Sequence, residues 1–209
     1  KLIKESVTRS ISNTKDCIIK IIYSRGLSDH GYNYNKDICP QLYVIKKLYN
    51  KGIKKSFIKL GFSGHTINNN SYLSKIKHLN RIDQVLGTTL KSKKKYDEYI
   101  LCNSKNDIIE CISSNIFFYN LRQKNYTFFT PDLTNCGVEG IMKQQIIKTL
   151  KRNKFIINEK VLSKRDIIKF QGCLICNVVK GVQFVNKIEN RNIKHDVLIE
   201  DLLKKYIYE

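Results

Sequence analysis

The chain has 209 residues, of which 42% are hydrophobic and 27% charged. Those fractions exclude a disordered tail and a collagen-like or low-complexity chain, and the length suits one or two domains. No apolar run approaches the ~20 residues that span a bilayer, and the first residues carry no signal-peptide pattern. We therefore expect a cytoplasmic protein with no membrane partner.

The formal net charge of +20 suggests a nucleic-acid partner, because clustered Lys and Arg release counterions from phosphate backbones. The basic residues are 31 Lys and only 7 Arg, beside 30 Ile, 20 Asn and no Ala. Lys, Ile and Asn have A/T-rich codons, whereas Ala codons are G/C-rich, so codon supply explains much of this basicity. Phosphate recognition favours the Arg fork, which is scarce here. We expect no nucleic-acid partner despite the charge, and a dedicated basic surface is the open alternative.

The seven cysteines have no regular spacing. An odd number without a framework argues against disulfides. Cys173 and Cys176 form a C-x-x-C pair, but the apolar residues around them indicate a buried strand. Because no second pair or paired His is placed to complete a zinc site, we expect no metal and interpret the thiols as small buried hydrophobes.

The first fifty residues predict two short strands separated by a polar connection. Cys17 to Tyr23 is apolar and β-branched, as a strand requires. Residues 26–40 are rich in Gly, Asn and Tyr and predict a loop, and residues 41–44 predict a second strand. A Lys-rich connector follows, where we place a domain boundary that gives domains 1–50 and 51–209.

The larger part of the chain alternates strand and helix patterns. Apolar residues at helical spacing predict a helix over 80–91 and another from Ile141, with Ile146, Ile147 and Leu150 on one face. Further helices are predicted over 163–169 and 197–207. Turn-rich stretches are predicted at 61–70 and 103–107, and strands at 53–60, 99–102, 108–118, 126–129, 155–157, 172–178 and 182–185. The mixture, with hairpins, predicts an α/β or α+β fold with mixed sheets.

Three features of this part bear on chemistry. Lys77 stands in the apolar segment 76–79, Glu110 lies in an otherwise apolar and small stretch, and Gly140 leads into a helix whose free N–H groups can hold an anion. An amine, a buried carboxylate and a phosphate cradle are what a pyridoxal phosphate enzyme needs. Desolvation makes a buried lysine amine reactive, so we expect Lys77 to be buried. Each feature alone also fits a solvated lysine, a strand-surface carboxylate or a loop glycine.

Three strings resemble motifs of the 4-amino-4-deoxychorismate lyases, which are class IV, branched-chain aminotransferase-like pyridoxal phosphate enzymes. The first, LSKIKHLNRIDQVL at 73–86, resembles the segment with the cofactor lysine. The second is IECISSNIF at 109–117, and the third is TPDL at 130–133 followed by CGVEGIMK at 136–143. All three stand in the family's order and at similar separations, and the resemblance extends over nearly the whole chain from about Cys17.

The resemblance implies a fold type IV enzyme with pyridoxal 5'-phosphate between two domains. Lys77 would bond to the cofactor and move a proton on the substrate, and Glu110 would hold the pyridine nitrogen. Backbone N–H groups of Ile141 and Met142 would bind the phosphate. The other implied contacts are Asn177 and Arg81 with the cofactor, and Arg25 and Tyr32 with the substrate.

The implied reaction converts 4-amino-4-deoxychorismate into 4-aminobenzoate and pyruvate for folate biosynthesis, in a homodimer that acts on a small molecule. Branched-chain and D-amino acid aminotransferases share the fold, but they carry a Gly-Asn-Tyr-like pattern where this chain has His78-Leu79-Asn80-Arg81. Lys143 stands where the family has Arg. The family has roughly 70 further residues upstream, the size of a small extra domain, so we expect an incomplete N-terminal domain, with 1–50 as its remnant and 51–209 as the cofactor domain. An aminotransferase and a truncated, non-catalytic relative stay as alternatives.

Overall fold

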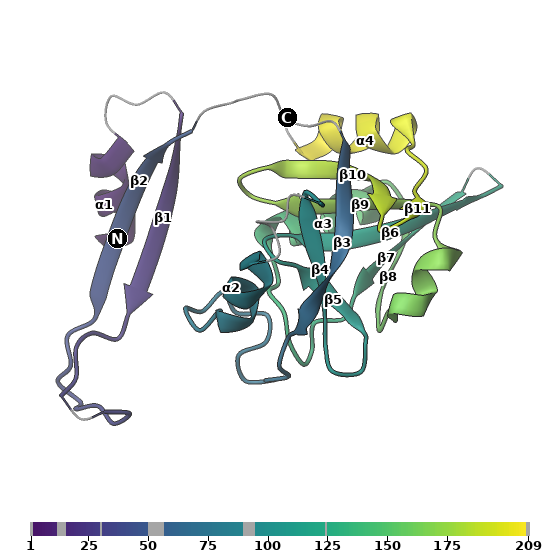
Figure 1. The fold of residues 1–209 in the computed structure, drawn as a ribbon. Helices are drawn as coiled ribbons and strands as arrows, with labels where there is room; N and C mark the ends of the chain where they lie inside the picture. Colours follow the sequence, from purple (N-terminus) through teal and green to yellow (C-terminus); the bar gives the residue numbers. More distant parts are fainter. Residues whose placement is uncertain are drawn as a thin grey trace. The chain divides into compact units, whose positions relative to one another are not determined.

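The part of the chain that the computed structural model describes is residues 2–11, 16–29, 31–49, 57–89, 95–123 and 125–207. It divides into two compact units, unit 1 (Lys1–Lys54) and unit 2 (Lys55–Glu209), coloured from purple to blue and from blue to yellow in Figure 1. The domain boundary predicted between residues 50 and 51 lies outside the described residues and stays a prediction.

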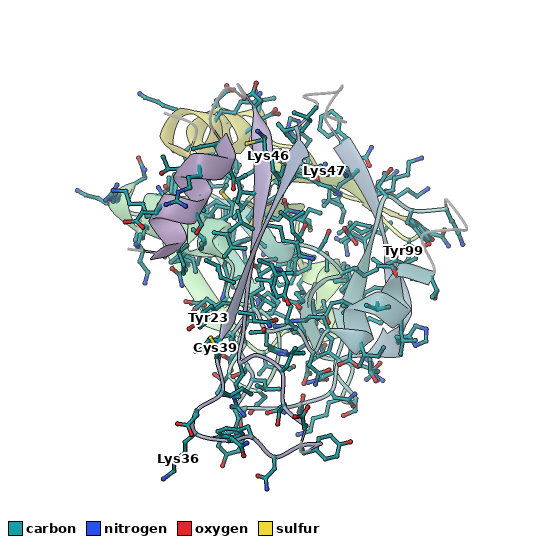
Figure 2. All side chains as sticks on the ribbon, turned by 90° about the vertical axis from the view of Figure 1, so that its left-hand side faces the viewer. Tyr23, Lys36, Cys39, Lys46, Lys47 and Tyr99 are labelled. Atoms are coloured by element: carbon teal, nitrogen blue, oxygen red, sulfur yellow. The ribbon has the colours of Figure 1, made fainter. Side chains whose placement is uncertain are left out.

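Unit 1 consists of a helix and a long hairpin. Helix α1 (Leu2–Ile11) precedes strands β1 (Cys17–Ser24) and β2 (Gln41–Leu48), which pair antiparallel along their whole length. Both predicted strands are confirmed, because each supplies the β-branched and aromatic residues that strands favour. Helix α1 is not among the predicted helices. In Figure 2, Lys36 extends from the connection between the strands, whereas Lys46 and Lys47 lie on β2.

Unit 2 is built on a curled sheet, which Figure 1 shows with its helices around it. Within the described residues the strand order is β5-β4-β3-β10-β9-β6-β7-β8, with β11 beside β10. Strand β3 runs parallel to β4 and β10, and β7 runs parallel to β8, while the other neighbours are antiparallel. This confirms the predicted mixed class. The strands are β3 (Phe57–Thr66), β4 (Glu98–Cys102), β5 (Ile108–Cys111), β6 (Asn115–Arg122), β7 (Asn125–Pro131), β8 (Ile156–Lys160), β9 (Gly172–Asn177), β10 (Gly181–Ile188) and β11 (Arg191–Asn192).

The helices of unit 2 are α2 (Ile82–Thr88), α3 (Ile141–Arg152) and α4 (Val197–Ile207), with a 3₁₀ helix, η2 (Lys164–Lys169). The predicted apolar face of α3 is confirmed, because its Ile146 and Leu150 are fully buried. On the same helix the ammonium of Lys143, also buried, lies 2.7 Å from the carboxylate of Glu159 on β8 and ties the first turn to the sheet. Among the described helices, none is long and apolar enough to cross a membrane.

The core of unit 2 covers both faces of the sheet. Along β9, Cys173 and Ile175 pack into one apolar cluster, and Leu174 and Cys176 pack into the other. This alternation is what the period of two in a strand produces when both faces are covered. The predicted buried strand around the C-x-x-C pair is therefore confirmed. All seven cysteines are free thiols, and those in the core are Cys102, Cys111, Cys136, Cys173 and Cys176.

Two secondary-structure predictions for unit 2 are wrong. The turn-rich stretch predicted from Gly61 is strand up to Thr66, because Gly61 leaves the room that the ring of Tyr96 fills: a Cβ there would lie 2.3 Å from that ring. The single strand predicted over 108–118 is two strands. A tight turn, in which Cys111 N–H donates to the Ser114 carbonyl, separates β5, which pairs with β4, from β6, which pairs with β9.

Candidate active site

A cavity of about 640 Å³ lies in unit 2, between the segment before α2, the turn after β5 and the first turn of α3. Its volume falls in the range of small-molecule and cofactor sites. The structure brings six of the predicted site residues together on its wall, namely Lys77, Arg81, Glu110, Ile141, Met142 and Asn177. Residues far apart in the sequence thus meet around one space.

Glu110 lies on β5, where it is 4% exposed. One carboxylate oxygen accepts the backbone N–H of Val138 at 2.8 Å, and the other accepts the side-chain amide of Gln84 at 3.0 Å. Burial raises the pKa of Glu110, and the two hydrogen bonds with the charges of Arg81 and Lys77 oppose that rise only in part. Each carboxylate oxygen keeps a lone pair for one more donor from the cavity.

The segment that carries Lys77 is held by its backbone. Lys75 donates its N–H to the Gly137 carbonyl at 2.9 Å and accepts from Glu139 N–H at 3.1 Å, and the guanidinium of Arg81 donates to the Ile76 carbonyl. Lys77 itself is exposed within unit 2. The prediction that it is buried is therefore wrong for this unit, because these bonds hold the backbone of the segment and leave the Lys77 side chain exposed on the cavity wall.

The first turn of α3 offers free donors to the cavity. Gly140 is the N-cap residue and supplies no side-chain cap, so the N–H groups of Ile141 and Met142 keep no partner within the helix. Asn115 fixes this turn: its amide donates to the Val138 carbonyl at 2.8 Å and accepts from Gly140 N–H at 3.2 Å. A Cβ on residue 140 would lie 2.3 Å from the Asn115 amide oxygen, which explains the glycine.

Residues 1–188 match the family model described as amino-transferase class IV. The chain belongs to that family. An aminodeoxychorismate lyase of Vibrio harveyi is 25% identical over 190 residues, which are 90% of this class IV chain and 69% of that protein. A probable branched-chain-amino-acid aminotransferase of Rickettsia felis is 33% identical over 113 residues, but they are 53% of this chain and 37% of that protein.

Solved structures confirm the fold of this class IV chain. The 4-amino-4-deoxychorismate lyase of Pseudomonas aeruginosa superimposes with a TM-score of 0.87 at 19% identity, over 98% of this chain and 75% of that one. An aminotransferase of Brucella abortus, whose structure holds pyridoxal phosphate, reaches 0.79 at 13% identity, over 99% and 72%. The predicted fold type IV is therefore confirmed.

The class IV fold leaves two predicted substrate contacts untested. Arg25 and Tyr32 belong to unit 1, and the cavity is lined by residues of unit 2. The guanidinium of Arg25 lies over the ring of Tyr34, 3.7 Å from its centroid. Both assignments stay predictions.

The residues of this class IV site that were not singled out by the sequence include Gln84, Ser114, Asn115 and Lys180. Asn115 had a usable signal, because it is the Asn of the second matched string. Gln84 and Ser114 lie inside the first and second matched strings, and Lys180 lies outside all three. Nothing in the sequence marked these three side chains, because a polar residue in an ordinary helix or turn looks the same whether it faces solvent or a cavity.

Proposed function

We propose that this protein is a pyridoxal phosphate-dependent lyase that converts 4-amino-4-deoxychorismate into 4-aminobenzoate and pyruvate. The observation that carries the proposal is that Lys77, Glu110 and the free N-terminus of α3 line one cavity. The likeness to lyases of Vibrio harveyi and Pseudomonas aeruginosa over at least 90% of this chain supports it. The proposal includes a cytoplasmic homodimer that acts in folate biosynthesis.

The residues present fit the cofactor. Glu110 is a buried carboxylate with lone pairs to spare, as a protonated ring nitrogen needs. The uncapped first turn of α3 suits a phosphate, since anions bind where helix N–H groups are free. When bound, pyridoxal phosphate supplies an aldehyde for the substrate amine and a sink for electrons.

The chain's own residues then have distinct roles. Glu110 shares a proton with the ring nitrogen, and Gln84 and Val138 keep its carboxylate in place. Lys77, exposed on the cavity wall, takes the proton from the substrate ring carbon that bears the amino group. The electron pair of that C–H bond enters the ring as the neighbouring C–O bond breaks. Enolpyruvate leaves with the C–O pair, gains a proton to become pyruvate, and leaves 4-aminobenzoate, so atoms and electrons balance.

A second candidate is a branched-chain amino acid aminotransferase of the same fold. It is favoured by the higher identity, 33%, to the Rickettsia felis protein over the shared 113 residues. Lys77 and Glu110 would keep their roles toward the cofactor, but the substrate would differ and amino transfer would replace the elimination.

The deciding assay offers both substrates to the purified protein with pyridoxal phosphate. With 4-amino-4-deoxychorismate we expect 4-aminobenzoate and pyruvate in equal amounts, followed by fluorescence and by a coupled lactate dehydrogenase reaction. With leucine and 2-oxoglutarate we expect no glutamate. Glutamate without 4-aminobenzoate would support the aminotransferase, and neither product would support the non-catalytic alternative.

The assignment of Lys77 has its own test. Borohydride reduction in the presence of pyridoxal phosphate should label Lys77, as found by peptide mass spectrometry, and Lys77→Ala should lose the label and all measurable turnover. Lys148→Ala, an exposed lysine on α3 outside the cavity, is the matched control and should keep both. Turnover by Lys77→Ala near the wild-type rate would refute the role.

A further inference from the structure

The side chain of Asn177 joins two segments of the cavity wall. Its amide nitrogen donates to the Ser113 carbonyl and to the Ser114 hydroxyl oxygen, both at 3.0 Å. Its amide oxygen accepts the N–H groups of Val179 at 3.0 Å and Lys180 at 2.7 Å. Both amide hydrogens are therefore used within the protein, and Asn177 has none left to donate to a ligand.

Ser114, which accepts one of these hydrogen bonds from Asn177, keeps a free hydroxyl donor. It is 6% exposed, and its hydroxyl oxygen already accepts from Asn177, so its own hydrogen is the group that still needs a partner. No acceptor for that hydrogen is found among the described residues, and Ser114 lines the cavity. The neighbouring Ser113 differs, because its hydroxyl donates to the buried carboxylate of Glu98 at 2.7 Å. Ser114 also directly precedes Asn115, which bonds the start of α3.

Lys180 brings a positive charge to the same wall. It lines the cavity from the turn between β9 and β10, is exposed, and makes no ion pair within the described part of the chain. Its backbone is fixed by Asn177. The charged side chains that line the cavity are Lys75, Lys77, Arg81, Lys180, Glu110 and Glu139. Positive groups thus outnumber negative ones, which favours an anionic ligand.

We propose that the Ser114 hydroxyl and the Lys180 ammonium bind the phosphate of pyridoxal phosphate, beside the N–H groups of Ile141 and Met142. Asn177 is the positioning residue that holds both on the cavity wall. This inference rests on the proposed function, since it assumes that the cavity holds that cofactor. Under this proposal the positive charge beside the phosphate comes from Lys180, a residue of unit 2 that lies in none of the matched sequence strings.

The test compares the affinities of pyridoxal phosphate and of pyridoxal, which lacks the phosphate, by absorbance titration at low salt. Lys180→Met and Ser114→Ala should each weaken pyridoxal phosphate binding by about tenfold, as the loss of one hydrogen bond to a charged group predicts. Neither should change the affinity for pyridoxal. Lys180→Arg should restore most of the affinity, and Lys148→Met, the same charge change outside the cavity, should alter neither constant.

The positioning role of Asn177 is tested by a double-mutant cycle. Asn177→Ala should weaken binding of pyridoxal phosphate but not of pyridoxal, and in its background Lys180→Met should cost clearly less than in the wild type. Thermal unfolding, followed in parallel, checks that each variant is folded under the conditions of the titration. Equal losses for both ligands would show a merely structural role and overturn the assignment.

The remaining outcomes separate this inference from the proposed function. If wild type binds pyridoxal phosphate and Lys180→Met leaves its affinity unchanged, the phosphate assignment fails while the lyase proposal stands. If Lys180→Met raises only the KM for 4-amino-4-deoxychorismate, the ammonium serves a substrate carboxylate and the assignment also fails. If wild type binds neither pyridoxal phosphate nor pyridoxal, both proposals fall.

Discussion

At the scale of single residues, Glu110 shows what a buried carboxylate needs. A charge out of water is costly unless donors replace the lost solvation, and here an amide side chain and a backbone N–H do so. They offset the burial only in part, since the pKa of Glu110 stays raised. The site therefore keeps a proton more readily than a solvated glutamate does, and it can share that proton with a ring nitrogen.

The raised pKa of Glu110 predicts how stability depends on pH. The folded protein holds this proton more tightly than the unfolded chain, so the contribution of Glu110 to the free energy of unfolding is lost as pH rises from about 4.5 through the raised pKa. Glu110→Gln should remove this contribution to the pH dependence of the free energy of unfolding. It should also lower that free energy by about 1 kcal/mol, because the hydrogen bonds of the side chain change. Urea unfolding of both proteins between pH 5 and pH 8 measures the difference. Parallel profiles would contradict the prediction.

Features of the site that depend on neighbouring residues can be predicted from the sequence, whereas contacts between residues far apart along the chain cannot. An acid in an apolar stretch and a glycine before a helix are local signals, and both residues line the cavity. The partners of Glu110 are 26 and 28 residues away along the chain, and no local pattern could pair them. The exposure of Lys77 was also beyond a local pattern, because apolar neighbours such as Ile76 and Leu79 are themselves exposed.

At the scale of elements, the position of α3 depends on one close approach. Asn115 on β6 bonds both Gly140 and the Val138 carbonyl, so the start of the helix is tied to the sheet. Gly140 has φ −68 and needs no left-handed backbone, so its requirement for glycine is one of space alone.

Gly140→Ala is therefore expected to displace the Asn115 side chain. We expect a loss of about 1–3 kcal/mol in stability from overpacking, and a weaker affinity for pyridoxal phosphate because the N–H groups of α3 shift. The matched control is Gly64→Ala on β3, where a Cβ meets nothing within 4 Å. Urea unfolding and absorbance titration test both variants, and equal behaviour of the two would count against the steric explanation.

Element types were predicted better than element limits. Helix α3 was predicted from apolar residues at helical spacing, and in the structure those residues, Ile146, Ile147 and Leu150, are buried on one face. The sequence of 108–118 predicts one strand because apolar residues stand on both sides of the turn, such as Ile109 before it and Ile116 after it, and only the hydrogen bonds between Cys111 and Ser114 reveal the break. Turn chemistry built on serine is weaker in sequence than turns built on Gly or Pro.

At the scale of the whole molecule, the thiols report on folding. Cys39, in the connection between β1 and β2 and next to Tyr23 in Figure 2, is exposed, whereas five thiols are buried in unit 2. Burial raises the pKa of Cys102 and Cys136 to about 11 and that of Cys176 to about 12. Since the thiolate is the reactive form, the buried thiols should react slowly with a disulfide reagent at pH 8.

We therefore expect one fast reaction in the native protein, with Cys17 slower because it is half-buried, and seven fast reactions in guanidinium. Cys39→Ser should abolish the fast phase in the native protein and leave the slow reaction of the five buried thiols unchanged. Fast labelling of all seven thiols under native conditions would contradict the burial of the core.

The parallel pairing of β3 with β10 has a consequence for synthesis on the ribosome. Phe57 is registered with Phe184, 127 residues later, so the middle of the sheet closes only when nearly all of unit 2 has emerged. Until then β3 presents an unpaired apolar edge next to β4, which is the kind of surface that nascent chains misassemble through. Chaperone demand during translation should therefore peak late, just before the β9–β10 hairpin leaves the exit tunnel.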